Sequence, residues 1–334
     1  MEFELSLVWA MIIAFAVLIY VILDGFDLGI GILFPFADSE QDKAVMMNSI
    51  APVWDGNETW LVMGGGSLFA VFPLAYAVIM PALYMPIIIM LLALIFRGVA
   101  FEYRWRTHRW KPVWDFAFFG GSLTAAFMQG IALGAIVQGI KIADRAYAGG
   151  WWDWLSPFSI LTGCAVVVGY SLLGSTWLIM KTEGGIQARM RDFSKLLGLG
   201  TLGFIGIVSL ITPFLDIAYF QRWFTFPGSI FSVVIPSLLI LCSWLLFTGL
   251  EKRREIQPFL ASLGIYILSF SGIVVSFYPK IVPPSLTIAE AAAPDSSLKF
   301  TLVGTAILIP LILAYTAYAY WVFRGKVNPE ENYH

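Results

Sequence analysis

Two apolar stretches of this 334-residue sequence each contain a pair of carboxylates. The first stretch holds Asp24 and Asp27, and the second holds Asp55 and Glu58, so the members of each pair stand at positions i and i+3. In a helix, this spacing puts both acids of a pair on one face. A charged side chain in the middle of a bilayer costs roughly 2.5–3.5 kcal/mol on insertion scales, so acids in membrane spans tend to be functional. The four acids therefore indicate a path for protons or cations.

The composition makes lipid the solvent of these acids. Hydrophobic residues make up 59% of the chain and charged residues 13%, against roughly 45–50% and 25% in soluble proteins. The mean hydropathy is +0.81. These values exclude a soluble enzyme, a nucleic-acid-binding protein and a disordered regulator. The formal net charge of -2 does not indicate an anionic partner.

Runs of about 20 apolar residues predict an all-α polytopic membrane protein with about nine transmembrane helices in a single integral membrane domain, residues 1–334. The predicted spans lie near residues 5–34, 44–72, 75–98, 114–140, 157–181, 195–215, 228–250, 257–278 and 299–323. At 1.5 Å per residue, Asp24 would lie about 15 Å, and Asp55 about 16 Å, from the same end of two antiparallel helices. The two acid pairs are therefore expected at one level.

Lysine and arginine set the expected orientation. With nine spans, 15 of the 20 basic residues fall on the side of the C-terminus: Lys43, Arg97, Arg104, Arg106, Arg109, Lys111, Lys181, Arg189, Arg191, Lys195, Lys252, Arg253, Arg254, Arg324 and Lys326. Because basic residues collect in cytoplasmic loops, the N-terminus is predicted outside and the C-terminus in the cytoplasm. Arg104, Arg106, Arg109 and Lys111 are expected to anchor the chain at the inner headgroups.

A shared polar patch of Asp24, Asp27, Asp55 and Glu58 has two interpretations. Crowded carboxylates at low dielectric cannot all ionise, so some would hold protons, as a proton relay requires. Alternatively, the acids pair with Arg97, with an asparagine in the second span or with backbone freed by glycines, and serve structure only. Arg97 lies deeper than the other basic residues and is the predicted partner of the patch.

Histidine and cysteine are too scarce for metal or haem chemistry in this chain. The two histidines, His108 and His334, lie in a basic loop and at the C-terminus. The two cysteines, Cys164 and Cys242, lie inside apolar runs and form neither a disulfide framework nor a haem-attachment motif. We therefore expect no metal site and no haem in this chain. Gln129, in the fourth predicted span, is expected to form helix-to-helix hydrogen bonds.

In the first third of the chain, several motifs together resemble subunit II of the cytochrome bd-type quinol oxidases. The matching runs are residues 24–31 (DGFDLGIG), 48–57 (NSIAPVWDGN), 60–61 (WL), 69–70 (FA), 72–73 (FP), 76–77 (YA) and 97–104 (RGVAFEYR). The chain length, the nine spans and the external N-terminus also fit this family. Glu58 stands where many members have glutamine, which resembles the cyanide-insensitive branch.

The resemblance implies a heterodimer in the bacterial cytoplasmic (inner) membrane that oxidises quinol and reduces O2 to water. A haem-bearing subunit I would carry the b-type and d-type haems. Subunit II would consist of two four-helix bundles plus one peripheral helix and would carry no catalytic haem. Some family members hold a structural quinone in this subunit, to which no residue is assigned here, and small accessory subunits are a further expected partner.

The resemblance also implies roles for individual residues. Asp55 matches a position proposed for a proton channel from the cytoplasm to the haems of subunit I. Asp24 and Asp27 would extend that channel, with Glu58 as an additional titratable group and Arg97 tuning their charge. In some members an aromatic residue near the entrance of an O2 tunnel occupies the position of Trp60.

Glycine-rich faces are expected to pack helices closely in lipid and to join this chain to subunit I. These glycines are Gly25, Gly29, Gly31, Gly64, Gly65 and Gly66. Two other classes of function remain open. Acids near the middle of the membrane beside glycine breaks are also typical of a proton- or cation-coupled secondary transporter. The chain would otherwise be a purely structural scaffold whose acids a partner neutralises.

Overall fold

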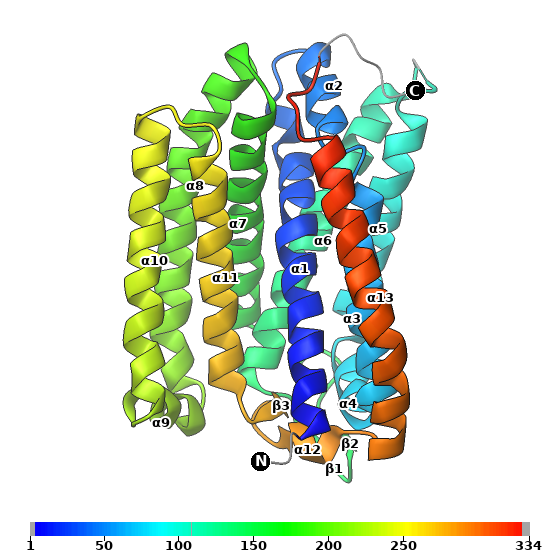
Figure 1. Ribbon diagram of the computed structural model, residues 1–334, viewed down its shortest axis with the longest axis vertical. Coiled ribbons are helices and arrows are strands. Elements are labelled where there is room, and N and C mark those ends of the chain that lie inside the picture. The colour runs from blue at the N-terminus through cyan, green and yellow to red at the C-terminus, as the bar shows by residue number, and fades with distance from the viewer. Residues whose placement is uncertain (1–3, 108, 329–334) are drawn as a thin grey trace.

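Long apolar runs form long helices in the computed structural model, which describes residues 4–107 and 109–328 (Figure 1). His108 and His334 lie outside the described residues. The long helices are α1 (Leu5–Leu33), α3 (Trp54–Val71), α5 (Tyr84–Tyr103), α6 (Lys111–Gln138), α7 (Pro157–Lys181), α8 (Gly184–Ile211), α10 (Gly228–Glu251), α11 (Gln257–Phe277) and α13 (Asp295–Val322).

Short elements cover the two ends of the bundle. The first end, which we call the basic end, carries η1 (Phe34–Phe36) and α2 (Glu40–Asn48). The opposite end carries α4 (Pro73–Ala82), α9 (Ile217–Phe224), α12 (Ile288–Ala291) and two small antiparallel sheets, and η2 (Thr212–Phe214) leads into α9. The sheets pair β1 (Ile142–Ala143) with β2 (Ala146–Tyr147), and β3 (Lys280–Val282) with β4 (Leu286–Thr287).

The helices have the length and hydropathy of membrane spans. Among the described residues, eight helices are long and apolar enough to cross a membrane. They are the nine long helices without α3, whose first turns contain Asp55, Asn57 and Glu58 and so lower its hydropathy. Because α3 lies beside α1 in the bundle (Figure 1), we count it with the other eight as a span, at the place of the predicted span 44–72. The predicted class, an all-α polytopic membrane protein, is confirmed.

The structure corrects three predicted spans. The predicted helix near 75–98 is divided, because α4 ends at Ala82 and α5 runs from Tyr84 to Tyr103. The predicted helix over 44–72 is interrupted: α2 ends at Asn48, residues 49–53 form turns, and α3 begins at Trp54. Pro52 lacks a backbone N–H and disfavours the helical conformation of the residue before it, which explains the break. The predicted span 195–215 begins at Gly184 instead, because long basic side chains let a helix continue beyond the apolar layer.

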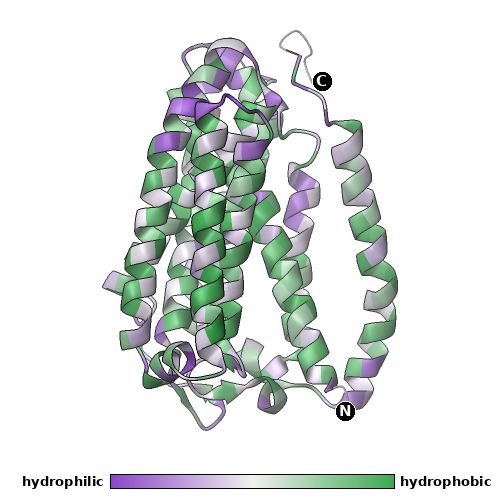
Figure 2. Ribbon diagram, turned by 60° about the vertical axis from the view of Figure 1, so that its left-hand side comes forward, coloured by the Kyte–Doolittle hydropathy of each residue, from purple (hydrophilic) through white to green (hydrophobic). Residues whose placement is uncertain are grey.

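The nine long helices form two groups of four, with α13 at the edge. The first group contains α1, α3, α5 and α6, and the second contains α7, α8, α10 and α11 (Figure 1). Figure 2 shows α13, which leads to the C-terminus, standing apart from both groups, and apolar residues dominating the middle of the helices. This agrees with two four-helix bundles plus one peripheral helix.

The two groups meet where α1 crosses α7 at glycine. A Cβ atom on Gly29 would lie 1.8 Å from the backbone oxygen of Tyr170, and one on Gly174 would lie 2.5 Å from the carbonyl carbon of Gly29. Only glycine permits such a close approach of two backbones. The crossing therefore fixes α1, which carries Asp24 and Asp27, in the centre of the molecule.

Candidate functional site

Arg97 of α5 lies at the centre of the acid cluster, which we define as Asp24, Asp27, Glu58 and Arg97. Its Nη1 atom donates a hydrogen bond to Oε1 of Glu58 at 2.8 Å. The same atom lies 3.7 Å from Oδ1 of Asp24, and Nη2 lies 4.0 Å from Oδ2 of Asp27. Three of the four predicted acids therefore surround the predicted arginine partner.

The polar side chain of Asn57 orients Asp27. Its Nδ2 donates to Oδ2 of Asp27 at 2.7 Å, and its Oδ1 accepts a hydrogen bond from the hydroxyl of Tyr320 at 2.9 Å. Tyr320 belongs to α13, so this short chain of bonds joins the peripheral helix to the acid cluster. Asn57 is the asparagine of the structural interpretation, and its contact with Asp27 supports a positional role.

Helix geometry explains which acids face inward. The buried face of α3 consists of Asn57, Trp60, Gly64 and Val71, spaced as one side of a helix. Glu58 lies beside this face and reaches Arg97, whereas Asp55 lies two positions before Asn57 and is exposed. The predicted patch of four acids is thus a cluster of three carboxyl groups, two buried and that of Glu58 partly exposed, with Asp55 on the surface of the chain.

Close packing of α6 on α5 buries the side of Arg97 that faces α6. A Cβ atom on Gly121 would lie 2.6 Å from the backbone oxygen of Ala93 and 3.1 Å from Cβ of Arg97. Arg97, Asp24 and Asp27 have at most 1% of their surface exposed. The side chain of Glu58 is 25% exposed, so it is the member of the cluster that reaches the surface.

The charges of the acid cluster do not balance within the chain. Three carboxyl groups share one guanidinium, so two of them must be neutral or meet a further cation. Several buried atoms also lack a hydrogen-bond partner among the described residues: both carboxyl oxygens of Asp24, Oδ1 of Asp27, and Nε and Nη2 of Arg97. Carboxyl groups that lack hydrogen-bond partners and lie beside a fixed cation can take up and release protons.

An aromatic layer separates the acid cluster from the basic end. The rings of Trp54 and Phe101 stack 4.8 Å apart and parallel within 1°, and the guanidinium of Arg97 lies over both rings. Phe118 packs edge-on against Phe101 at 5.1 Å and against Phe34 at 5.0 Å. These four rings leave the side of the cluster near α3 as its less enclosed side.

A second charge cluster lies beyond the aromatic layer. Arg104 is 1% exposed and pairs with Asp115 and, at 2.9 Å, with Glu40. Lys43 bridges the same two carboxylates at 2.8 and 2.9 Å, and Lys111 lies 2.8 Å from Glu40. The prediction that Arg104 anchors the chain at lipid headgroups is wrong, because Arg104 is buried and pairs with carboxylates of the same chain.

These contacts shift the acid–base properties of α2. Partial burial alone would raise the pKa of Glu40. Hydrogen bonds from Lys111 and Lys43 and the charge of Arg104 outweigh this effect and lower the pKa of Glu40 to about 2. Burial likewise opposes the charge of Lys43, yet Asp115 and Glu40 raise the pKa of Lys43 above its usual value. Glu40 and Lys43 are therefore charged at neutral pH, and the ion pairs of the second cluster form a clamp that joins α2 to the end of α5 and to α6.

Other predicted residues lie around the acid cluster. Gln129 donates to the hydroxyl of Tyr20 at 2.7 Å and accepts from the hydroxyl of Tyr170 at 2.8 Å, which confirms its predicted helix-to-helix bonding. Trp60 is fully buried with Tyr20 and Ala16 between α1 and α3. Its role beside an O2 tunnel stays a prediction.

Sequence reasoning missed two contributors, Tyr320 and Asp115. Tyr320 is 263 positions from Asn57 in the chain, and no local pattern connects them. Asp115 lies in the first turns of α6 close to Lys111, where an acid inside a basic segment could have indicated an ion pair. Among the described residues, no group of three or more histidine, cysteine, aspartate or glutamate side chains could hold a metal ion.

Comparisons with known proteins place the chain in a family. The sequence model of the family described as cytochrome bd terminal oxidase subunit II matches residues 5–323. The chain is 31% identical to the cytochrome bd ubiquinol oxidase subunit 2 of Bacillus subtilis, with 97% of each chain covered. It is 28% identical to the cytochrome bd-I ubiquinol oxidase subunit 2 of Escherichia coli K12, over 98% of this chain and 96% of the relative.

A solved structure agrees with the fold. The bd oxidase from Geobacillus thermodenitrificans superposes with a TM-score of 0.75 at 18% identity, over 96% of this chain and 98% of that chain. The family match spans nearly the whole sequence, and the alignment with the Bacillus subtilis relative covers 97% of both chains. This chain therefore belongs to the cytochrome bd terminal oxidase subunit II family and is a multi-pass membrane subunit of an oxidoreductase complex.

Proposed function

We propose that this chain is the haem-free subunit of a quinol:O2 oxidoreductase and that its acid cluster supplies protons for the reduction of O2 to water. The names of the relatives support quinol as the electron donor. The family match favours this function over a proton- or cation-coupled transporter. The b-type and d-type haems would lie in subunit I, and a quinone in this chain and small accessory subunits stay predictions.

One observation is the main support for the proposed proton path: Glu58 both contacts Arg97 and reaches the surface of the chain. Because the aromatic layer closes the direct line from the basic end, we infer that protons travel along the outer side of α3. Asp55, exposed in the first turn of α3, would collect them, and Glu58 would pass them inward. Asp24 and Asp27 would then hold protons beside Arg97.

We place subunit I against the exposed side of α3. Apart from the adjoining backbone of α3, Cβ atoms on Gly65 and Gly66 would meet no atom of the described residues within 4 Å, so another helix can approach closely there. The prediction that Gly25, Gly29 and Gly31 join the chain to subunit I is wrong. Added Cβ atoms at these three positions would collide with α7 or α6 of the same chain.

The proposed orientation gives the path its direction. The basic end carries most of the lysine and arginine residues, so we place it, and the C-terminus, in the cytoplasm and the N-terminus outside. Protons consumed in making water would come from the cytoplasm while those released by quinol leave outside. The complex would then build a proton motive force across the bacterial inner membrane.

Two conservative substitutions test this function in the intact complex. Asp55→Asn and Glu58→Gln remove a titratable proton and preserve side-chain size. We expect each to slow quinol-driven O2 consumption at least tenfold, on the order of a general acid–base contribution, with an unchanged haem absorption spectrum. Glu102→Gln is the matched control, since Glu102 is exposed and its one ion pair among the described residues is with exposed Arg106.

Two other results would contradict the proposal. Wild-type turnover in both variants would remove α3 from the proton path. Loss of the haem spectrum together with turnover would indicate that the acids serve assembly, as in the scaffold alternative.

A further inference from the structure

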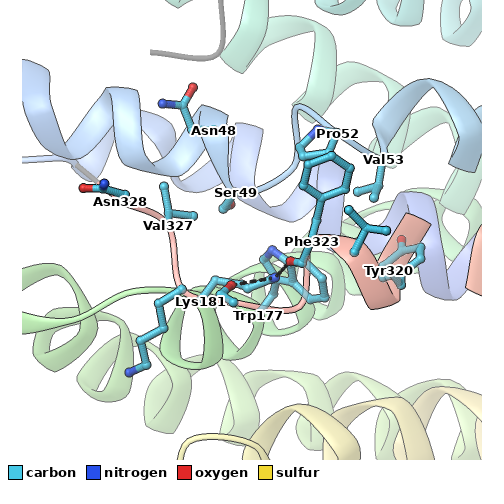
Figure 3. Close-up of a pocket in the computed structure, with 13 residues that line it drawn as sticks. Asn48, Ser49, Pro52, Val53, Trp177, Lys181, Tyr320, Phe323, Val327 and Asn328 are labelled. Atoms are coloured by element: carbon cyan, nitrogen blue, oxygen red, sulfur yellow. Dashed lines mark hydrogen bonds between the residues drawn. The ribbon is translucent and has the colours of Figure 1, made fainter. Parts of the chain in front are cut away.

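A cavity of about 200 Å³ opens at the basic end, between the ends of α7 and α13, the end of α2 and the turns formed by residues 49–53 (Figure 3). Its walls include Ser49, Trp177, Lys181, Tyr320 and Lys326. None of the described residues that line it is acidic, and two are lysines. The lining therefore carries an excess of positive charge.

Lys181 is the buried cation of this cavity. It is 6% exposed, and its Nζ atom donates to the backbone oxygens of Phe323 and, at 3.0 Å, Gly325 (Figure 3). These carbonyls follow α13, where partial negative charge favours a cation. Among the described residues, no carboxylate lies within 4.0 Å of Lys181, whereas Lys326 pairs with Glu255 at 2.7 Å.

Trp177 adds a second donor at the same place. Its ring is 4% exposed and stacks on Phe26 at 4.2 Å, so the indole has a fixed orientation. Its buried Nε1 has no hydrogen-bond partner among the described residues. The Nζ atom of Lys181 lies 5.2 Å from the centre of this ring. A buried donor without an acceptor costs about 1–3 kcal/mol, which an acceptor oxygen would recover.

We propose that this cavity binds a phosphate group, with Lys181 neutralising its charge and the indole N–H of Trp177 bonding one oxygen. The cavity lies at the end of membrane-spanning helices, at the level of lipid headgroups under the proposed orientation. The phosphate of an anionic phospholipid and free inorganic phosphate present the same chemistry. The site would fasten the ends of α7 and α13 to each other and to the turn before α3.

The experiment uses the intact complex, stripped of lipid in detergent, and compares wild type with Trp177→Phe. Phenylalanine keeps an aromatic ring against Phe26 and removes only the N–H. Native mass spectrometry would measure binding of phosphatidylglycerol, with phosphatidylcholine for comparison, and phosphorus NMR would measure binding of inorganic phosphate. We expect the variant to bind one of the two anionic probes about tenfold more weakly, as the loss of a hydrogen bond to a charged group predicts.

The two probes distinguish the sources. Weaker phosphatidylglycerol binding identifies a lipid headgroup site, and weaker binding of inorganic phosphate alone identifies a soluble ligand. Trp244→Phe is the matched control, because Trp244 is 61% exposed on α10. Equal binding of both probes by wild type and Trp177→Phe would overturn the proposal.

A further pair of variants distinguishes loss of binding from a folding defect. Lys181→Arg keeps the charge, whereas Lys181→Gln removes it and retains the backbone hydrogen bond from Val327 to residue 181. We expect the arginine variant to bind phosphate better than the glutamine variant when both unfold at similar temperatures. Equal binding by these two variants would also count against the site.

Discussion

The acid cluster is a case in which one cation holds several buried acids. Arg97 contacts three carboxyl groups within 4.0 Å, and each of these acids is more buried than acids usually are. Removing one partner of a buried ion pair leaves an uncompensated charge, which costs far more than an exposed pair gains. Arg97 is therefore expected to determine the stability of the cluster as well as its charge.

Substitution Arg97→Met tests this role. It leaves three buried carboxyl groups without a cation, and we expect a destabilisation of about 3–5 kcal/mol. The measurement is the thermal unfolding temperature and the yield of the assembled complex. Arg106→Met is the control, since Arg106 is exposed, contacts Glu102 at 3.5 Å and should contribute less than about 1 kcal/mol. Equal stability of the two variants would contradict the argument.

The residue scale also shows what could be predicted from the sequence. The spacing of Asp24 and Asp27 placed them on one face, and the depth of Arg97 identified their partner. The same spacing did not bring Asp55 into the cluster, because Asp55 and Glu58 both lie off the buried face of α3, and only Glu58 reaches Arg97. The break of the predicted span 44–72 at residues 49–53 was also missed. A break caused by one proline is hard to locate inside an apolar run.

At the scale of elements, the aromatic layer and the second charge cluster fix the basic end of the first helix group. Arg97 and Arg104 are two turns apart on α5, and stacked rings lie between them. Burial of Arg104 could not be predicted from hydropathy, because its acid partners come from α2 and α6. Long-range pairing of this kind depends on the packing of elements, not on their periodicity.

The clamp at α2 should weaken in acid. The pKa of Glu40, about 2 in the folded protein, lies below the usual 4.5 of the side chain. A lowered pKa contributes stability that is complete above about pH 4.5 and is lost as the pH falls toward 2. We therefore expect Glu40→Gln to unfold at a lower temperature than wild type at pH 7. The loss in the free energy of unfolding should be about 1 kcal/mol or less, because Glu40 is half-exposed.

Thermal unfolding followed by circular dichroism at several pH values checks this expectation. The difference in unfolding temperature between wild type and Glu40→Gln should become smaller as the pH is lowered from 4.5 to 3. A difference that stays constant over this interval would show that the ion pairs of Glu40 do not stabilise α2.

At the scale of the whole molecule, hydropathy predicted the architecture well because the membrane dictates it. Every span needs a long apolar run, and charged loops mark the ends of those runs. The contacts of α13 were beyond prediction. The hydrogen bond from Tyr320 to Asn57, and that from Lys181 to the backbone oxygen of Phe323 directly after α13, join segments that are far apart in sequence.

The exposed side of α3 should determine assembly with subunit I. Gly66→Leu adds a large side chain where this chain has open space, so its own fold should be preserved while association with a closely packed partner weakens. Gly203→Leu is a matched control, because Gly203 is an equally open glycine on α8. Co-purification of a haem-bearing subunit with each variant measures the effect.

We expect Gly66→Leu to recover at most a tenth of the haem-bearing subunit that wild type recovers, and Gly203→Leu to recover as much as wild type. Full recovery with both variants would place the partner on another face of the chain.

The central claim is that the acid cluster passes protons to the site of O2 reduction. Its most direct test is time-resolved proton uptake, followed with a pH-indicating dye as the fully reduced complex reacts with O2, in wild type and in Asp27→Asn. Our account predicts at least tenfold slower proton uptake in the variant, with an unchanged haem spectrum and normal O2 binding. Uptake at the wild-type rate in that variant would contradict the account.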